Sequence, residues 1–336
     1  MRRNAGDTLI NRFEFIEVQG EHPHLTFCRA VTDGLAETPK DIPTRFMYDQ
    51  AGSELFEQIT ELGEYYPTRT ERSLLQKRAG EIVETMGPNT AIVEFGSGSS
   101  VKTQLLIEAA LARQATLRYV PIDISFDFLK FSSGRLLAKY QELRISAVGG
   151  EYFDVANALP SHDGPRLILF LGSNIGNLTQ AGAVDFLSRL QRRLGAEDRL
   201  LVGIDLVKER HILEAAYNDA LGITAAFNRN VLARINRELD GQFQLDAFEH
   251  HAPYDDKEAR IEMRLYSRGK QTVAVQAIDR VYEFEDGEYI HTEWSHKFTV
   301  PSFTSVCALA GLSVDHVWTD ERQWFGLAML RSAVPS

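Results

Sequence analysis

Cysteine, long apolar runs and excess basic charge are all scarce in this chain of 336 residues. Its two cysteines, Cys28 and Cys307, form neither a metal-ligand spacing nor a disulfide framework. No apolar run reaches the roughly 18 residues of a membrane span and no secretory signal is seen, so we expect a cytoplasmic protein without a membrane partner. The net charge of -11 and the lack of a basic patch argue against nucleic acid as a partner.

Histidine gives no sign of a metal centre. The pairs His22/His24 and His250/His251 have no nearby cysteine or aspartate in a metal-binding pattern, so we expect solvated loop residues and no metal. The hydrophobic fraction of 44% and the charged fraction of 25% are ordinary for a globular protein, which leaves small molecules as the expected partners.

The most informative stretch is residues 91–103, Ala-Ile-Val-Glu-Phe-Gly-Ser-Gly-Ser-Ser-Val-Lys-Thr. An apolar strand is followed by a loop with Gly96 and Gly98 and then by a helical pattern, which is typical of the nucleotide-binding turn of a doubly wound α/β sheet. A second apolar segment ends at Asp123. A carboxylate there is suited to accept hydrogen bonds from both ribose hydroxyls of an adenosine-bearing cofactor.

Position 101 separates the cofactors that such a loop can serve. The dinucleotide fingerprint G-x-G-x-x-G and the phosphate loop G-x-x-x-x-G-K-[ST] both require glycine there, whereas this chain has Val101. A β-branched residue resists the positive φ and close phosphate approach that glycine permits. The E-x-G-x-G loop of methyltransferases that use S-adenosylmethionine (SAM) has no pyrophosphate to bind, so we favour SAM. A tight turn in some other α/β protein would leave Asp123 unexplained.

Apolar segments alternate with helical ones from about residue 90 to 206. We predict strands at 91–95, 117–122, 144–148, 166–171 and 199–205, and helices at 104–113, 126–141 and 180–194. Continuous apolar strands suit a parallel sheet that is buried on both faces, so the pattern predicts a βαβ series. A helix over 302–311 and strands over 313–319 and 324–330 would close the sheet with an antiparallel hairpin. The predicted fold class is therefore an α/β, Rossmann-like class I methyltransferase fold with a doubly wound sheet.

Residues 206–296 interrupt this series and predict an α+β insertion. A helical stretch covers 209–239, and strands are expected at 259–267, 271–278 and 279–290. Because ligands of doubly wound sheets bind at the carboxyl ends of the strands, we interpret the insertion as a substrate lid. We expect residues 1–60 to precede the first sheet strand and to pack with the lid. The predicted domains are a SAM-binding domain (62–206 and 297–336) and a substrate-binding domain (1–61 and 207–296).

Seven blocks in a fixed order resemble one family. They are residues 46–56, 63–71, 94–103, 119–125, 170–177, 216–219 with 224–230, and 291–298. Their order and spacing resemble the SAM-dependent histidine Nα-methyltransferases, which make hercynine, the trimethylated histidine that begins ergothioneine biosynthesis. The resemblance spans about 40 to 330 and implies SAM as methyl donor and an amino acid as substrate. We expect a monomer.

The resemblance implies two groups of site residues. The cofactor group is Tyr65, Gly96, Lys102, Asp123, Glu151 and Tyr152, and the substrate group is Tyr48, Asn177, Tyr217, Met263, Glu293 and Ser295. Asn177 is similar to an asparagine that holds the α-amino and carboxylate groups, Tyr217 to a tyrosine that binds the carboxylate, and Tyr48 to a tyrosine that faces the amine. Tyr48 and Asn177 are thus the implied catalytic pair. Glu293 and Ser295 match a pair that binds the imidazole, and Met263 matches a methionine that packs against it.

These residue types suit the chemistry. Methyl transfer from a sulfonium to a neutral amine is an in-line displacement, for which positioning supplies roughly 7–11 kcal/mol. Amide and hydroxyl groups hold a zwitterion and still let its nitrogen rotate between transfers. A buried carboxylate such as Glu293 selects a ring with an N–H group, because an unpaired buried acceptor costs about 1–3 kcal/mol. We therefore expect Glu293 to govern substrate choice rather than the chemical step.

Structural interpretations remain open for several of these residues. Asn177 would then be a helix N-cap, Tyr48 and Tyr217 packed core residues, Met263 a core filler, Lys102 an exposed helix residue and Glu293 a surface acid. Asn174 stands where the family has threonine, and Trp294 would narrow the pocket only if its strand bulges. The alternative functions are the same reaction on tryptophan or tyrosine, and a non-catalytic SAM-binding module.

Overall fold

The computed structural model describes residues 12–18, 23–156 and 159–333, and these form two compact units. Among them, unit 1 holds residues 12–18, 67–156, 159–206 and 298–333, and unit 2 holds residues 23–66 and 207–297. The start of the chain therefore differs from the expected division, which placed all of residues 1–61 with the insertion. Residues 12–18 belong instead to the unit that carries the glycine loop.

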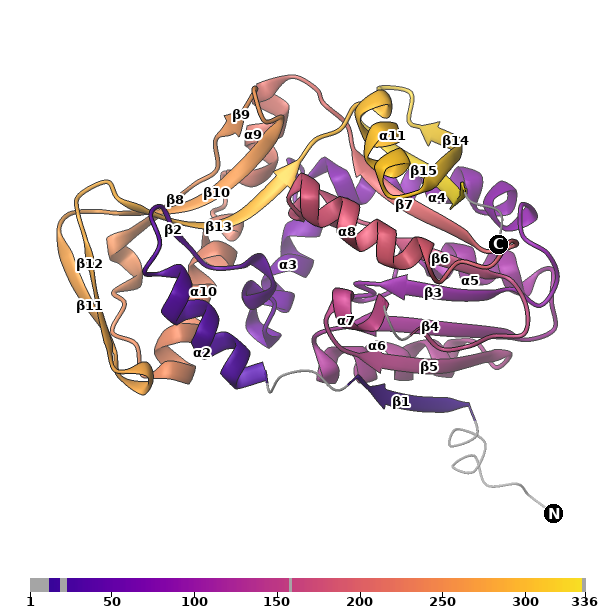
Figure 1. Cartoon of the computed structure of the whole chain (residues 1–336), viewed down its shortest axis with the longest axis horizontal. Coiled ribbons are helices and arrows are strands. Elements are labelled where there is room, and N and C mark those ends of the chain that lie inside the picture. The colour runs from indigo at the N-terminus through magenta and orange to yellow at the C-terminus, as the bar shows by residue number, and fades with distance from the viewer. Residues whose placement is uncertain (1–11, 19–22, 157–158, 334–336) are drawn as a thin grey trace, which may run out of the picture. The chain divides into compact units, whose positions relative to one another are not determined.

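Unit 1 is built on a sheet with the strand order β1-β5-β4-β3-β6-β7-β15-β14 (Figure 1). The strands are β1 (Phe13–Glu17), β3 (Ala91–Phe95), β4 (Leu117–Asp123), β5 (Leu143–Gly149), β6 (Arg166–Phe170), β7 (Arg199–Asp205), β14 (Leu312–Thr319) and β15 (Phe325–Ser332). Neighbours from β1 to β7 pair in parallel, whereas β15 runs antiparallel to both β7 and β14. The five predicted strands, the closing hairpin and the doubly wound α/β fold class are confirmed.

The expectation that the first sheet strand follows residue 60 is wrong. β1 pairs in parallel with β5, from Phe13 opposite Ile145 to Glu17 opposite Gly149. Phe13 and Phe15 pack against the core below the sheet, while Glu14 between them is exposed. The strand covers only five residues and does not alternate strictly, because Ile16 is half-buried as well, so the sequence signal is too short to assign to one sheet.

Helices cover both faces of this sheet. The helices α4 (Tyr66–Glu84), α5 (Gln104–Leu111) and α6 (Phe126–Lys139) bury apolar residues in one core, and α7 (Tyr152–Ala156), α8 (Gln180–Gln191) and α11 (Val300–Leu309) do so in a second core. Successive residues of β3 pack into different cores, with Ile92 in the first and Val93 in the second. A strand buried on both faces must be apolar throughout, which explains its continuous apolar sequence.

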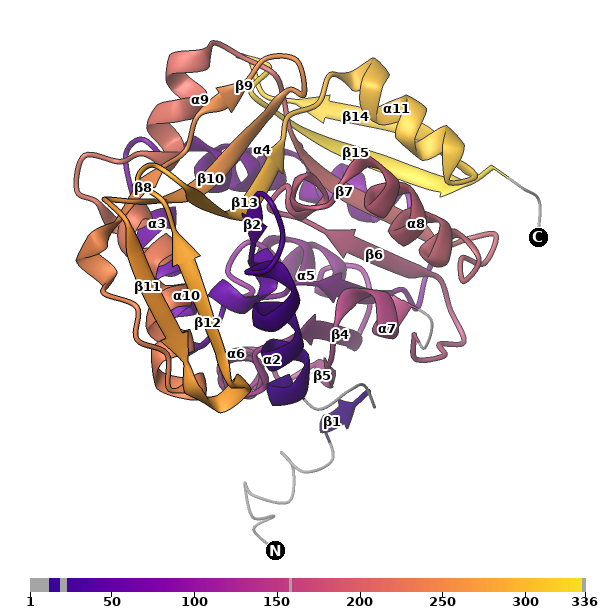
Figure 2. The same ribbon diagram turned by 60° about the vertical axis from the view of Figure 1, so that its left-hand side comes forward.

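Unit 2 combines a small sheet with helices and a hairpin. The sheet has the order β2-β13-β10-β8, with β9 paired to β10. Its strands are β2 (Lys40–Asp41), β8 (Phe248–His251), β9 (Tyr254–Asp255), β10 (Arg260–Ser267) and β13 (Tyr289–His296). The helices are α2 (Pro23–Gly34), α3 (Gln50–Thr60), α9 (Arg210–Tyr217) and α10 (Ile223–Leu239), and the hairpin is β11 (Gln271–Val275) with β12 (Arg280–Phe284). Figure 2 shows this hairpin beside α10.

Two predicted elements of the insertion are divided in the structure. The helical stretch 209–239 is two helices, because Gly222 has a φ of +72° and Asp219 accepts hydrogen bonds from the amides of Ile223 and Thr224 at the start of α10. The predicted strand 279–290 is β12 followed by the beginning of β13, with a turn at Gly287, whose φ is +76°. Strand β8 was not predicted.

Candidate functional site

The predicted residues of unit 1 lie at the carboxyl ends of its parallel strands. Gly96 follows β3, Asp123 ends β4, Glu151 and Tyr152 follow β5, and Asn177 comes soon after β6. Because β3, β4, β5 and β6 are neighbours in parallel register, their carboxyl ends share one edge of the sheet. This is the edge at which doubly wound sheets bind ligands.

Asp123 is tied directly to the glycine loop. Its Oδ2 accepts a hydrogen bond from the Gly98 amide at 3.0 Å, and its Oδ1 accepts one from the Ser125 amide at 3.0 Å. Burial raises the pKa of this carboxyl group, and the backbone hydrogen bonds oppose the rise. A Cβ on Gly98 would meet nothing within 4 Å, so space is open beside this residue. Asp123 and the loop therefore place a carboxylate acceptor next to backbone at Gly98 that no other side chain covers.

Glu94 anchors the strand side of the same loop. Its carboxylate is 3% exposed and accepts hydrogen bonds from Thr103 Oγ1 at 2.6 Å and from the Tyr119 hydroxyl. The Tyr119 hydroxyl also bonds to Ser100 Oγ at 2.9 Å. Burial raises the pKa of Glu94 to about 7, against the effect of its hydrogen-bond donors. Because Ser100 and Thr103 flank the turn into α5, Glu94 fixes the shape of the loop.

Glycine at position 96 is required by the side chains above it. Its φ is +70°, and a Cβ would lie 2.3 Å from the Tyr152 hydroxyl and 2.8 Å from Asn174 Nδ2. The Tyr152 ring packs on Phe170 and Phe95, with centroids 5.4 and 6.1 Å away. The structure thus places the Tyr152 hydroxyl and the Asn174 amide at the glycine loop. The predicted position of Tyr152 near the adenine stays a prediction.

Lys102 takes part in a buried ion pair. Its ammonium group binds the carboxylate of Glu71, which is fully buried on α4. Glu71 also accepts the Gly172 amide, at 2.8 Å and 3.0 Å from its two oxygens. The pair therefore links the loops after β3 and β6, and the interpretation of Lys102 as an exposed helix residue is wrong. Its predicted contact with the cofactor stays a prediction.

Asn177 is not a helix N-cap. It is the last residue of a 3₁₀ turn, η2 (Asn174–Asn177), and Thr179 caps α8 by accepting the Gly182 amide at 3.0 Å. The half-buried Asn177 amide is therefore not committed to capping α8, although it lies just before that helix. Glu151 lies immediately before α7 on the same edge of the sheet.

The residues of unit 1 fit SAM better than a dinucleotide. Two glycines with positive φ and the half-buried carboxylate of Asp123 lie together, as an adenosine-bearing cofactor requires. Val101 stands where close approach of a pyrophosphate needs glycine, and its side chain is exposed. The donor and acceptor set therefore agrees with the sequence-based choice.

The three predicted tyrosines of unit 2 share one aromatic group. Tyr48 packs edge-to-face on Phe56 and Phe227, with ring centroids 5.5 and 5.3 Å away. Tyr65 lies 6.1 Å from Phe56 and 6.1 Å from Tyr217. Tyr65, which was assigned to the cofactor, thus shares a unit with the tyrosines assigned to the substrate.

Tyr48 is held in place by its neighbour in the chain. Asp49 caps α3 through the Gly52 amide at 2.8 Å, and its carboxylate also accepts Asn230 Nδ2 at 2.7 Å and pairs with Arg237 at 2.5 Å. Both partners lie on α10, so this helix fixes the turn that carries Tyr48. Asn230, in the block 224–230, therefore helps to hold the turn in the block 46–56.

Met263, Glu293 and Ser295 lie on one face of the sheet in unit 2. Met263 on β10 is directly opposite Glu293 on β13, and Ser295 follows two residues later, opposite Ile261. The register shift between β10 and β13 falls at Thr292, before Glu293. Strict alternation therefore holds from Glu293 onward, and Trp294 lies on the other face, where its ring stacks 4.5 Å from that of His291.

Glu293 is a buried carboxylate rather than a surface acid. It is 6% exposed, and among the described residues its Oε2 has no hydrogen-bond partner. Burial raises its pKa to about 7, and the positive charge of Lys297 opposes this rise. A buried acceptor left without a donor is costly, so this side chain has the properties of a ligand-binding group.

Lys297 was not predicted and belongs to the same face. Its side chain is almost fully buried, and its ammonium group donates to Ser295 Oγ at 2.7 Å and to the Tyr217 hydroxyl at 3.0 Å. Tyr217 and Ser295 also bond to each other at 2.7 Å. Lys297 lies in the block 291–298, one of the seven blocks that carry the family resemblance. It was not predicted because the sequence alone does not show that a lysine is buried.

A second buried hydrogen-bond network ends on the backbone carbonyl of Tyr217. Thr292 donates to Asn228 Oδ1 at 2.6 Å, Asn228 Nδ2 donates to His250 Nδ1 at 2.9 Å, and His250 Nε2 donates to the Tyr217 carbonyl at 2.8 Å. Burial lowers the pKa of His250, which keeps the ring neutral for this arrangement. The expectation of a solvated loop histidine is therefore wrong for His250, which lies on β8. His22 is outside the described residues.

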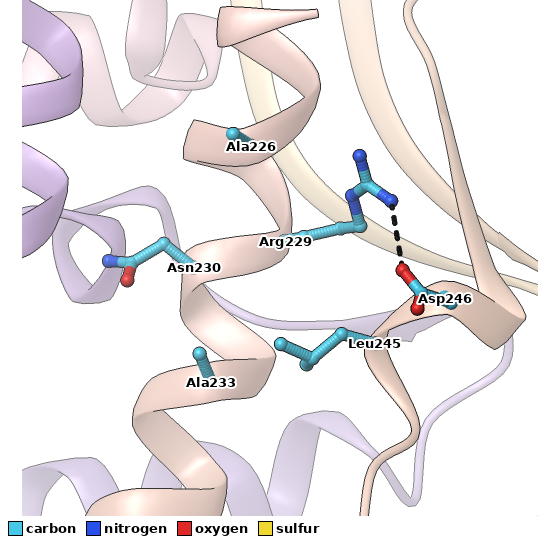
Figure 3. Close-up of a pocket in the computed structure, with 6 residues that line it drawn as sticks. All are labelled: Ala226, Arg229, Asn230, Ala233, Leu245 and Asp246. Atoms are coloured by element: carbon cyan, nitrogen blue, oxygen red, sulfur yellow. Dashed lines mark ion pairs between the residues drawn. The ribbon is translucent and has the colours of Figure 1, made fainter.

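The rest of unit 2 offers a small hollow that contains none of the predicted residues (Figure 3). It has a volume of about 290 Å³ and is lined by Ala226, Arg229, Asn230, Ala233, Leu245 and Asp246. The described parts of the chain contain no cluster of three or more His, Cys, Asp or Glu side chains suited to a metal ion. Within the same residues, no helix has the length and apolar character needed to cross a bilayer.

Known proteins match this chain over most of its length. A family described as "Histidine-specific methyltransferase, SAM-dependent" matches residues 27–332. A histidine N-alpha-methyltransferase of Mycolicibacterium smegmatis is 46% identical, over 90% of this chain and 93% of that protein. An L-tryptophan methyltransferase of Psilocybe serbica is 28% identical, over 94% of this chain and 95% of that one. Ergothioneine biosynthesis protein 1 of Neurospora crassa is 29% identical over 87% of this chain, which spans 33% of that longer protein.

Proposed function

Because the chain belongs to the family of histidine-specific, SAM-dependent methyltransferases, we propose that it transfers three methyl groups from SAM to the α-amino group of L-histidine. The product is hercynine, and the pathway is ergothioneine biosynthesis. The choice of histidine rests on one face of the sheet in unit 2. There the carboxylate of Glu293, whose Oε2 has no hydrogen-bond partner among the described residues, has Met263 opposite it on β10 and Ser295 two residues further along β13. An apolar side chain, an acceptor and a hydroxyl together suit a flat ring with an N–H group.

Apart from Tyr65, which belongs to unit 2, the residues assigned to the cofactor belong to unit 1. Asp123 would accept the ribose hydroxyls, Gly96 and Lys102 would border the methionine part, and Glu151 and Tyr152 would lie near the adenine. Tyr65 is assigned to the same cofactor. When bound, SAM supplies the electrophilic methyl group. The chain's own contribution is to hold an amine on the axis of displacement, which positioning alone can accelerate strongly.

The substrate role falls to the polar side chains already described. Tyr217 and Asn177 would bind the carboxylate and amine of the amino acid, and the Tyr48 hydroxyl would orient the amine nitrogen. No strong base is needed, because the amine that attacks is neutral. Hydroxyl and amide groups allow the nitrogen to rotate after each transfer, whereas a carboxylate at the amine would hold it as an ammonium ion.

The test is mass spectrometry of L-histidine incubated with purified protein and excess SAM. The proposal expects a product heavier by three methyl groups, with fragmentation placing them on the α-nitrogen. A product from L-tryptophan or L-tyrosine but not histidine would replace the substrate and retain the reaction. SAM binding without any methylated amino acid would contradict the proposal and favour a non-catalytic module.

We also propose that the protein works as a monomer in the cytoplasm. The acidic composition and the two unpaired cysteines agree with a reducing compartment. Light scattering on the purified chain tests the first part, since a mass near 37.9 kDa is expected. Fractionation of cells that express the gene tests the second.

A further inference from the structure

Asn174 lies at the ligand-binding edge of the sheet in unit 1, and the proposed function gives it no role. It is half-buried and begins the turn η2 that follows β6. Asparagine in a turn commonly bonds to its own backbone. Among the described residues, however, no hydrogen bond of the Asn174 side chain is found. The acceptor and the two donors of its amide group are therefore left for a ligand.

The turn that carries Asn174 is fixed on both sides. Gly172 has a φ of +73°, and Ser173 has a φ of +58°, which a residue with a side chain rarely adopts. The Gly172 amide donates to Glu71 Oε1 at 2.8 Å, and Ser173 Oγ accepts the Asp205 amide at 2.9 Å. Backbone that its surroundings hold in a rare conformation is common at ligand sites. The backbone that positions Asn174 is therefore set before a ligand binds.

The Asn174 amide lies between two glycines, one from each loop. A Cβ on Gly96 would lie 2.8 Å from its Nδ2, and a Cβ on Gly172 would lie 3.5 Å from its Oδ1. That Cβ on Gly172 would also lie 3.5 Å from Lys102 Nζ, so the amide and the ammonium group border the same backbone position. Lys102 has three donors and uses one of them on Glu71. The loops after β3 and β6 thus present an amide and a cation beside backbone without side chains.

We propose that Asn174 is a further contact for the methyl donor and binds the amino-acid end of SAM. This inference rests on the proposed function, in which Gly96 and Lys102 border the methionine part of the cofactor. That part ends in an α-ammonium and an α-carboxylate group. Lys102 attracts the carboxylate, and the amide oxygen of Asn174 provides the acceptor that the ammonium group needs. Asn174 therefore recognises the amino-acid end of the donor and not its adenosine.

The experiment compares two ligands that differ at this end. S-adenosylhomocysteine keeps the α-ammonium and α-carboxylate groups, and 5′-methylthioadenosine lacks both. Calorimetry gives the dissociation constant of each for the wild type and for Asn174→Ala. We expect the constant of S-adenosylhomocysteine to rise about tenfold in the variant, because a hydrogen bond to a charged group is lost, and that of methylthioadenosine to change less than about twofold. A variant that only distorts the glycine loop would weaken both ligands alike.

Gln180→Ala is the matched control. Gln180 is an exposed residue with the same amide group, at the start of α8 in the same unit. Its loss should leave both dissociation constants within about twofold of wild type. If Asn174→Ala fails to fold, Asn174→Thr takes its place with the same two ligands. This variant keeps one polar group on a shorter side chain, so we expect a smaller rise that is again confined to S-adenosylhomocysteine.

The outcomes separate this inference from the proposed function. An Asn174→Ala variant with wild-type affinity for S-adenosylhomocysteine contradicts the contact, and so does an equal weakening of both ligands. A raised histidine KM with unchanged affinity for S-adenosylhomocysteine would place Asn174 at the amino-acid substrate and contradict the contact too. A wild-type protein that binds neither SAM nor S-adenosylhomocysteine contradicts the proposed function itself, and with it the ligand that Asn174 is inferred to bind.

Discussion

Glu94 in unit 1 and Glu293 in unit 2 are both buried glutamates with a raised pKa, but they differ in their hydrogen-bond partners. Both are almost fully buried, and burial raises the pKa of each to about 7. Glu94 accepts hydrogen bonds from Thr103 and Tyr119, whereas no hydrogen bond of Glu293 is found among the described residues and its Oε2 is unsatisfied. The same residue type thus has its hydrogen-bond acceptors filled in unit 1, where it holds the glycine loop, and has an unfilled acceptor in unit 2.

This difference separates structural from binding carboxylates. A buried acid whose acceptors are filled stabilises the local backbone, and its removal leaves the donors without partners. A buried acid whose acceptors are not filled destabilises the chain until a ligand supplies a donor. Loss of Glu94 should therefore reduce stability, and loss of Glu293 should reduce substrate binding.

The largest expected effect is on stability after Glu94→Ala. This change leaves the Thr103 and Tyr119 hydroxyls without their acceptor in a buried site, at a cost of about 2–6 kcal/mol for the two groups together. Urea unfolding measures it, with Glu293→Ala as the matched control. Equal losses of stability in the two variants would remove the contrast between the two acids.

The second prediction concerns the dependence of stability on pH. A raised pKa means that the unfolded chain loses the proton first, so the stability due to the protonated acid is full below about pH 4.5 and is lost as pH rises through about 7. Relative to wild type, Glu293→Gln should gain on the order of 3 kcal/mol between pH 4.5 and 8. Unfolding curves across this range measure it, and a pH-independent difference would sink the buried-carboxylate interpretation.

The third prediction concerns binding by the same residue. Glu293→Ala should raise the histidine KM by roughly 10–100-fold, because a hydrogen bond to a charged group is worth about 1.5–3 kcal/mol. It should leave the affinity for SAM unchanged and admit apolar aromatic amino acids. Steady-state kinetics measures the change, and the same KM as wild type would show that Glu293 does not contact the substrate.

The fourth prediction concerns the cofactor half, where Asp123 is the binding carboxylate. Asp123→Ala should weaken SAM binding by no more than about 3 kcal/mol, the worth of hydrogen bonds to a charged acceptor. It also frees the Gly98 amide, so part of the loss comes from the loop. Calorimetry with SAM measures it, and wild-type affinity would exclude Asp123 from the site.

The sequence predicts the sheet of unit 1 well because its strands are buried on both faces. Such strands are continuously apolar, and the glycine loop and Asp123 mark their carboxyl ends. The short strand β1 carries no such signal, since it has five residues, two of which are exposed glutamates, and its apolar residues are only half-buried. The turn between β12 and β13 was also missed, because the exposed residues of a turn resemble those of an outward strand face.

The sequence names candidate residues for the site but does not reveal the hydrogen-bond network around them. Glu293, Ser295 and Met263 are found on one face, as their spacing allowed, and the bulge at Thr292 that fixes this register is invisible in the sequence. Lys297 and His250 were missed for a common reason. Whether a lysine is buried or a histidine neutral depends on partners far away in the chain, such as Tyr217 and Asn228.

The most direct test of the central claim is one competition experiment on wild type and Glu293→Gln in parallel. Each protein is given SAM and an equimolar mixture of the twenty amino acids, and mass spectrometry identifies every methylated product. We expect trimethylated histidine as the main product of the wild type, and a loss of that preference in the variant with SAM binding intact. The same product profile from both proteins would contradict the assignment of Glu293 as the group that selects the substrate.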